Sequence, residues 1–146
     1  MKRMLFGACL VMTACAPGSP GPSTIRFGED ACAHCRMTIL GLETAAQIVL
    51  PGAEPVMFDE IGCLRDYLAH GPLAADATIF VADHRSGAWI DARSAVFTKT
   101  TMHTPMSSGL LAHADSVSRD ADPSAHDGLL VAAADVLAPP VLSARP

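Results

Sequence analysis

The sequence lacks the basic and aromatic residues that a nucleic-acid-binding surface requires. Its 146 residues contain ten lysines and arginines against 15 aspartates and glutamates, and only 5% of the residues are aromatic. No stretch interleaves basic with aromatic side chains. A protein with this negative charge would be repelled by the phosphate backbone, so nucleic-acid binding is excluded.

Familiar catalytic motifs are also missing. The chain contains no GxSxG, no Walker loop and no GxGxxG, the patterns that accompany hydrolysis, nucleotide binding and dinucleotide binding. No two histidines stand four residues apart, as they do in a common type of zinc enzyme. We therefore expect a protein that is not an enzyme. Four scattered histidines are then expected to be surface or packing residues: His70, His84, His113 and His126.

The N-terminus has the layout of a bacterial lipoprotein signal. Two basic residues precede an apolar run at residues 4–11, and small residues lead into Cys15. The run is too short to span a bilayer, which takes about 20 apolar residues. Cleavage of residues 1–14 would leave 132 residues with lipid on Cys15, whereas an ordinary secretory signal would be cut near Ala14 or Ala16. Both readings place the protein outside the cytoplasm.

The expected location is the periplasmic face of a bacterial membrane. Ala16 follows the lipidated cysteine where inner-membrane lipoproteins typically carry aspartate, which favours the outer membrane. Without the signal, eight basic residues remain against 15 acidic ones, a formal charge of −7. Cys32, Cys35 and Cys63 also remain, an odd number in a compartment where thiols are usually paired.

Proline-rich segments bound a single folded region. Residues 15–24 contain the sequence APGSPGPS and suit a flexible tether, and residues 138–146 are expected to be a disordered tail. The domain between them covers residues 25–137.

Short strands outnumber helices in this domain. Hydrophobic runs and turn residues predict strands at residues 45–50, 55–58, 78–82, 88–91, 109–113 and 129–134. Residues 59–68 show helical spacing, and residues 116–127 allow only a short helix because Pro123 interrupts them. We therefore predict an α+β fold of small antiparallel sheets with short helices.

The densest group of metal-binding residues is Cys-Ala-His-Cys-Arg-Met at residues 32–37. Thiolate and thioether sulfurs are soft donors that favour Cu(I) over hard cations and over zinc. If residues 35–39 are extended, Cys35 and Met37 point to the same face. We therefore predict Cys35 and Met37 as copper ligands, with Cys32 as a weaker candidate.

A second sulfur-bearing group lies at residues 102–106, in a polar stretch where a core methionine is not expected. Met106 is the better ligand candidate there, with Met102 and His103 behind it. Met57, in contrast, lies between Val56 and Phe58 and is expected in the core.

Three further residues around the expected helix are given structural roles. Cys63 has apolar neighbours, and a free cysteine there behaves as a small buried hydrophobe. Asp59 and Glu60 stand where the helix is expected to begin, so a favourable interaction with the helix dipole explains both carboxylates.

Three separated segments together resemble the NosL family, periplasmic lipoproteins that deliver copper to nitrous oxide reductase. They are Asp-Ala-Cys-Ala-His-Cys-Arg-Met at residues 30–37, Phe-Asp-Glu-Ile-Gly-Cys-Leu at residues 58–64 and Thr-Pro-Met-Ser-Ser-Gly at residues 104–109. With the lipoprotein cysteine, their order and spacing cover most of the mature chain.

The resemblance implies a Cu(I) chaperone built from two related ββαβ units, here residues 25–75 and 76–137, that supplies nitrous oxide reductase or its membrane assembly machinery. It implies Cys35 and Met37 as ligands and Met106 as the third candidate. The family usually has glycine where this chain has Arg36. Whether two chains share one copper, and so form a homodimer, is left open.

Two other functions remain open from the sequence. Cys32 and Cys35, with Thr104 and Pro105, also resemble the sites of thioredoxin-like thiol–disulfide oxidoreductases, although no tryptophan precedes the CxxC and no long helix is expected after it. A structural disulfide or zinc site is the other alternative. Cys63 would then be a third zinc ligand, but the spacing shows no fourth.

Overall fold

The computed structural model describes residues 20–138. The expected signal segment, Cys15 with its lipid, and the tail beyond Ala138 lie outside the described residues. Within them, no helix combines the length and the apolar character needed to cross a membrane.

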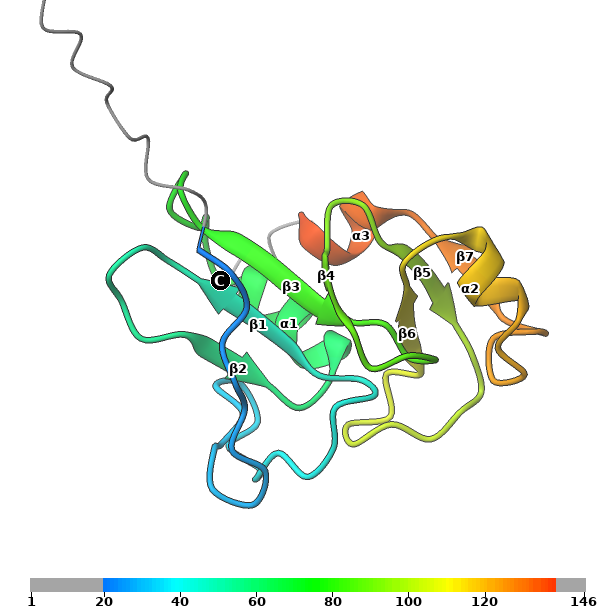
Figure 1. Ribbon diagram of the computed structural model, residues 1–146, viewed down its shortest axis with the longest axis horizontal. Helices are drawn as coiled ribbons and strands as arrows, with labels where there is room; N and C mark the ends of the chain where they lie inside the picture. The colour runs from blue at the N-terminus through cyan, green and yellow to red at the C-terminus, as the bar shows by residue number, and fades with distance from the viewer. Residues whose placement is uncertain (1–19, 139–146) are drawn as a thin grey trace, which may run out of the picture.

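The predicted α+β class is confirmed: two antiparallel sheets are accompanied by short helices (Figure 1). The first sheet has the order β2-β1-β3-β4, with β1 Ala46–Val49, β2 Val56–Phe58, β3 Thr78–Ala82 and β4 Trp89–Asp91. The second has the order β6-β5-β7, with β5 Val96–Lys99, β6 Leu110–His113 and β7 Leu129–Val131. The helices are α1 Ile61–Leu68, α2 Ser116–Asp120 and α3 Ala133–Leu137.

The same ββαβ arrangement occurs twice. In each unit the first strand becomes the central one, its hairpin partner pairs on one side, and the strand after the helix pairs on the other. β1, β2, α1 and β3 form the first unit, which β4 extends. β5, β6, α2 and β7 form the second, which α3 follows. Because β3 pairs with β1, the division expected between residues 75 and 76 falls inside the first unit, and the sheets separate between Asp91 and Val96.

Two elements differ from the sequence prediction. β5 was not expected, because Val96 and Phe97 are followed by polar residues that look like loop; the buried Thr98 nevertheless lies in the central strand of the second sheet. The last strand ends at Val131 rather than residue 134, and the alanines after it begin α3. Alanine has the highest helix propensity, so a helix there agrees with the local sequence.

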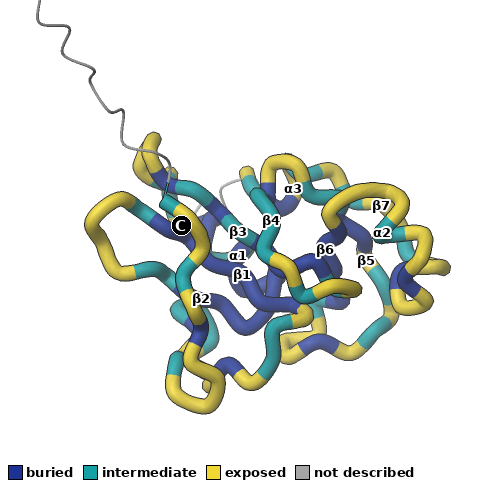
Figure 2. Tube along the Cα trace, viewed as in Figure 1, coloured by how far each residue is buried: buried dark blue, intermediate teal, exposed yellow. Residues whose placement is uncertain are grey.

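One hydrophobic core joins the two units. Phe58 and Leu64 from the first unit belong to the same buried cluster as Phe97 and Val136 from the second half. α1 contacts both β6 and α3, and the buried part of the chain runs continuously through both sheets (Figure 2). Met57 is buried in a smaller neighbouring cluster, which confirms the expectation that it is a core residue.

A buried carboxylate also ties the units together. Asp83, just after β3, accepts hydrogen bonds from the Ser86 N–H at 2.8 Å, the Ala114 N–H at 2.7 Å and the Ser118 hydroxyl at 3.0 Å. Burial alone would raise the pKa of Asp83, but these hydrogen bonds outweigh it and lower the pKa to about 2. The charged form therefore holds the β3–β4 turn against the start of α2.

Candidate metal centre

The first motif loop, residues 31–38, is a tight turn rather than a strand. The Cys32 N–H donates to the Met37 carbonyl at 2.8 Å, and the Arg36 N–H donates to the Cys32 carbonyl at 3.0 Å. Arg36 has a φ of 66°, in the left-handed region. The condition for Cys35 and Met37 to share one face of a strand is therefore not met, because hydrogen bonds across the loop fold the chain back between them.

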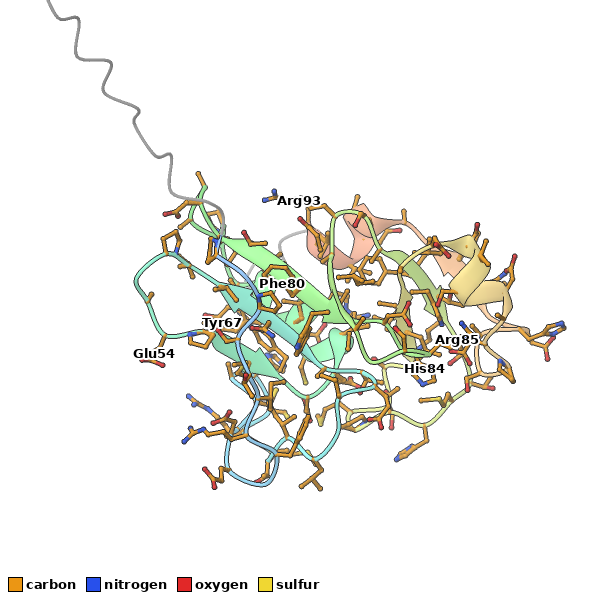
Figure 3. The ribbon with its side chains drawn as sticks, viewed as in Figure 1. Glu54, Tyr67, Phe80, His84, Arg85 and Arg93 are labelled. Carbon is orange, nitrogen blue, oxygen red and sulfur yellow. The ribbon has the colours of Figure 1, made fainter. Side chains whose placement is uncertain are left out.

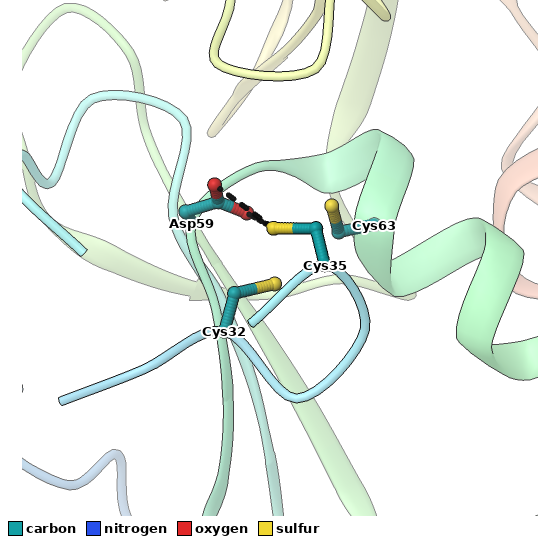
Figure 4. Close-up of side chains that lie close together, drawn as sticks. All are labelled: Cys32, Cys35, Asp59 and Cys63. Atoms are coloured by element: carbon teal, nitrogen blue, oxygen red, sulfur yellow. Dashed lines mark hydrogen bonds between the residues drawn. The ribbon is translucent and has the colours of Figure 1, made fainter. Parts of the chain in front are cut away.

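Four side chains converge behind this loop to form the cysteine cluster: Cys32, Cys35, Asp59 and Cys63 (Figure 4). One ligand atom from each lies within 4.8 Å of the others. The Cys35 thiol donates to the Asp59 carboxylate, with sulfur–oxygen distances of 3.5 and 3.6 Å. Cys32, Asp59 and Cys63 are buried and Cys35 is half-buried, and all three cysteines are free thiols.

Hydrogen bonding inside the cluster divides the thiols into two kinds. A hydrogen bond from Cys63 lowers the pKa of Cys32 to about 6 despite its burial, and the same bond raises the pKa of Cys63. Burial raises the pKa of Cys35. Since the thiolate is the form that binds metal, the lowered pKa makes Cys32 the thiol of the cluster that most readily becomes a ligand.

The sequence does not place Asp59 in the cluster, and it predicts a ligand role for Cys63 only in the structural-zinc alternative. α1 begins at Ile61 with Glu60 as its N-cap, so Glu60 stands at the helix N-terminus as expected, whereas Asp59 lies one residue before the cap. Asp59 instead faces Cys35. The core position of Cys63 is confirmed, but its sulfur also faces the cluster. Both residues lie in the segment at residues 58–64 that resembles the NosL family, and this resemblance is the sequence feature that could have identified them.

A groove of about 610 Å³ opens beside the cluster and brings the two sulfur-bearing segments together. Met37 and Asp59 line it from the first unit, and Met102 and His103 line it from the second. Met37 is 48% exposed, so the groove offers a thioether that solvent and partners can reach. Met106 is 49% exposed and does not line the groove. Met102 and His103, the weaker candidates from the sequence, do line it.

The second motif loop, residues 104–109, is held in place by its own threonine and glycine. The Thr104 hydroxyl accepts from the Gly109 N–H at 3.0 Å, and the Thr100 N–H donates to the Gly109 carbonyl at 2.8 Å. Gly109 has a φ of 60°, and a Cβ there would lie 2.4 Å from the Thr100 carbonyl oxygen. Glycine is therefore required at this position.

The second motif loop touches the start of α1. A Cβ on Gly62 would lie 2.4 Å from the Cβ of Ser108. Only glycine permits this approach, and the residue after it is Cys63. The contact therefore fixes the second motif loop next to the cysteine cluster.

The arrangement provides soft donors at an accessible site. The thiols belong to the cysteine cluster, the thioethers and an imidazole line the groove, and Asp59 is common to both. This donor set fits Cu(I), which prefers thiolate and thioether sulfur. An open side also leaves room for a ligand from a partner, which a closed four-ligand cage would not.

Comparison with known proteins gives one match. A protein-family model described as NosL matches residues 10–139, most of the chain. No curated protein and no solved structure matches the chain significantly.

Proposed function

The chain belongs to the NosL family, and on that premise we propose that it is a Cu(I) chaperone that carries copper in its groove and is not itself an enzyme. Family membership and the cysteine cluster support a metal-binding function of the copper type. The finer statement, that the metal is Cu(I) and is passed on, rests on the donors around the groove.

A single observation carries the proposal: Met37 and Met102, from two units of the fold, line the same groove beside the thiols. A methionine that only filled space would be expected in a core, as Met57 is. Cys35 is the least buried of the three thiols, so it and Met37 are the ligands nearest to an incoming partner. Transfer then proceeds by exchange of these ligands, one at a time.

The acceptor in this proposal is nitrous oxide reductase or its membrane assembly machinery. Lipid on Cys15 would hold the chaperone at the periplasmic face of the outer membrane, with residues 16–24 as the tether. Copper destined for a periplasmic enzyme would then be handed over without release into solution.

Cu(I) titration against a chromogenic chelator, under reducing conditions, tests the binding step. We expect Cys35→Ser and Met37→Leu each to weaken Cu(I) binding by at least about tenfold, because each removes a soft donor. Met57→Leu is the matched control, since it makes the same change in the core and leaves the groove intact. Equal affinity in all four proteins would refute the proposal.

Mixing the copper-loaded protein with copper-free nitrous oxide reductase and its assembly machinery tests delivery. Copper should appear on the acceptor faster than from the chelator alone. If the protein binds Cu(I) tightly but does not accelerate copper transfer to the acceptor, it is a copper store. That result would disprove delivery and leave the binding step standing.

Structural zinc is the second candidate, because the fourth ligand that the sequence did not show is present. Asp59 completes a set of three sulfurs and one oxygen, enough for tetrahedral zinc. Elemental analysis after purification without added metal separates the two. Stoichiometric zinc that Cu(I) cannot displace, and that Asp59→Asn loses, would favour this candidate over the chaperone.

The oxidoreductase alternative is less well supported by the geometry. Cys32 is fully buried, and no helix follows Cys35 before β1. Redox-active CxxC pairs instead expose a low-pKa thiol for attack. Here the thiol with the lowered pKa is the inaccessible one.

A further inference from the structure

A second group of metal-binding side chains lies outside the cysteine cluster. His84 Nδ1 is 2.6 Å from Asp122 Oδ2, and His113 Nε2 is 2.9 Å from the same oxygen. All three ligand atoms lie within 4.8 Å of one another. Because the two histidines are far apart along the chain, the sequence alone predicts surface or packing roles for both.

Three separate segments build this group. His84 stands on the loop after β3, in the region between the two sheets (Figure 3). His113 is the last residue of β6, and Asp122 follows α2. The hydrogen bonds of Asp83, beside His84, reach Ala114 after β6 and Ser118 in α2, and so hold the three segments together. The positions of the three side chains are therefore fixed by the packing of the two units.

The group is buried but has an entrance. The side chains of His113 and Asp122 are 0% and 5% exposed, whereas that of His84 is 12% exposed. His84 also lines the groove that contains Met37 and Met102. An ion could thus reach the group from the groove, past the His84 ring.

Hydrogen bonding orients the carboxylate of the group. The second oxygen of Asp122 accepts from the Ser124 N–H at 2.8 Å, which leaves Oδ2 directed at the two imidazoles. His113 Nδ1 is buried without a hydrogen-bond partner among the described residues, but it is not the nitrogen that meets Asp122. The three converging ligand atoms therefore carry the argument for an ion.

We propose that His84, His113 and Asp122 form a second metal site, which binds a divalent first-row cation such as Zn(II). Two imidazoles and a carboxylate suit borderline divalent ions rather than Cu(I), which prefers sulfur. Three protein ligands with a fourth, open position are a common zinc arrangement. Tetrahedral bonds of about 2.1 Å place ligand atoms about 3.4 Å apart, so the side chains would open by less than about 1 Å.

Co(II) titration of the intact, reduced chain under anaerobic conditions tests the site. Nitrogen and oxygen ligands give cobalt weak visible bands, whereas cysteine ligation adds strong sulfur-to-cobalt charge-transfer bands. We expect weak bands that saturate at about one equivalent, that persist in Cys35→Ser, and that Zn(II) abolishes by displacement. Persistence in Cys35→Ser makes this result independent of the proposed copper function.

The variants His84→Gln and Asp122→Asn should each weaken this Co(II) binding by at least about tenfold. The matched control is His126→Gln, which alters a histidine beside the carboxylate of Asp127, at 3.1 Å, on the exposed surface. Circular dichroism checks that each variant is folded, and Asp122→Asn preserves shape if His84→Gln does not fold. Equal binding in His84→Gln and His126→Gln, or bands of the cysteine type only, would reduce the group to a structural hydrogen-bond network.

Discussion

Arg36 stands where the family resemblance implies glycine. It stands between the proposed ligands Cys35 and Met37 in a left-handed conformation, which costs a residue with a Cβ about 1–2 kcal/mol. The glycine usual at this position in the family resemblance adopts that conformation without the penalty. The left-handed backbone of the loop therefore explains why glycine would be favoured at this position, and copper chemistry is not needed to explain it.

Arg36→Gly should raise the free energy of unfolding by about 1 kcal/mol, because it relieves this conformation. Urea denaturation of the metal-free protein measures the change. Arg36→Ala is the control, since it removes the same charge but keeps the Cβ. A gain of equal size in both variants would assign the effect to charge.

The pH dependence of stability should report on Cys32. Its pKa falls from about 8.5 in an unfolded chain to about 6 in the fold. A lowered folded pKa stabilises the protein fully above the unfolded value, and the contribution disappears as pH falls through about 6. The reduced, metal-free protein should therefore be less stable at pH 5.5 than at pH 8.5. Cys63→Ala removes the hydrogen-bond donor and should flatten the profile, as urea midpoints would show.

The proposed sulfur ligands follow from the sequence alone, but the carboxylate beside them could not be predicted. Cys32, Cys35 and Met37 are close along the chain and share a soft-donor chemistry that needs no structure to recognise. Asp59 stands 24 residues from Cys35, and its direction depends on where α1 begins. If the helix began at Asp59, its carboxylate would interact with the helix dipole. Because α1 begins two residues later, at Ile61, the carboxylate belongs to the cluster instead.

At the scale of secondary-structure elements, the turn after β3 acts as a connector. Asp83 accepts from backbone and hydroxyl donors on both sides of the boundary between the units. β3, the strand before this turn, has the bounds that the sequence predicted, because an apolar, β-branched run identified it as a buried strand. The connection made by Asp83 was not predictable, since its partners lie on α2 and at the end of β6.

Asp83→Asn should destabilise the protein by about 2 kcal/mol near neutral pH, because the amide presents N–H groups to donors that the carboxylate accepts. The wild-type protein should lose a similar amount as pH falls from about 4 to the folded pKa of about 2. Thermal unfolding between pH 2 and pH 7 measures both, and the variant should lack much of the acid-dependent loss. Asp91→Asn, at the half-buried last residue of β4, where the carboxylate accepts from the Arg93 N–H at 2.8 Å, is a control for general charge effects.

At the scale of the whole molecule, the two units share one core and so should unfold together. Phe58, Leu64, Phe97 and Val136 lie in a single cluster, which predicts one cooperative transition. A fragment ending at Ala92 should be unfolded alone, because it leaves the face of α1 toward β6 and α3 exposed. Circular dichroism of the fragment checks this, and a separately folded first unit would contradict it.

The groove was not predictable from sequence, although each of its parts was. Helical and strand periodicity identify elements one at a time, whereas the groove depends on the position of one unit relative to the other. This explains why Met102 and His103 ranked below Met106. All three stand in the same polar stretch, and only the packing of the units decides which of them line the groove.

The contact of Gly62 with Ser108 links the evolutionary histories of the two segments. A larger residue at position 62 would collide with the serine Cβ, so it could be accepted only if position 108 lost its side chain at the same time. Sequences of this family should therefore show coupled choices at these two positions, as residues in spatial contact do. A substitution at either of these positions is then restrained by the residue at the other. We therefore expect the two repeats to change together and not to be exchangeable with each other.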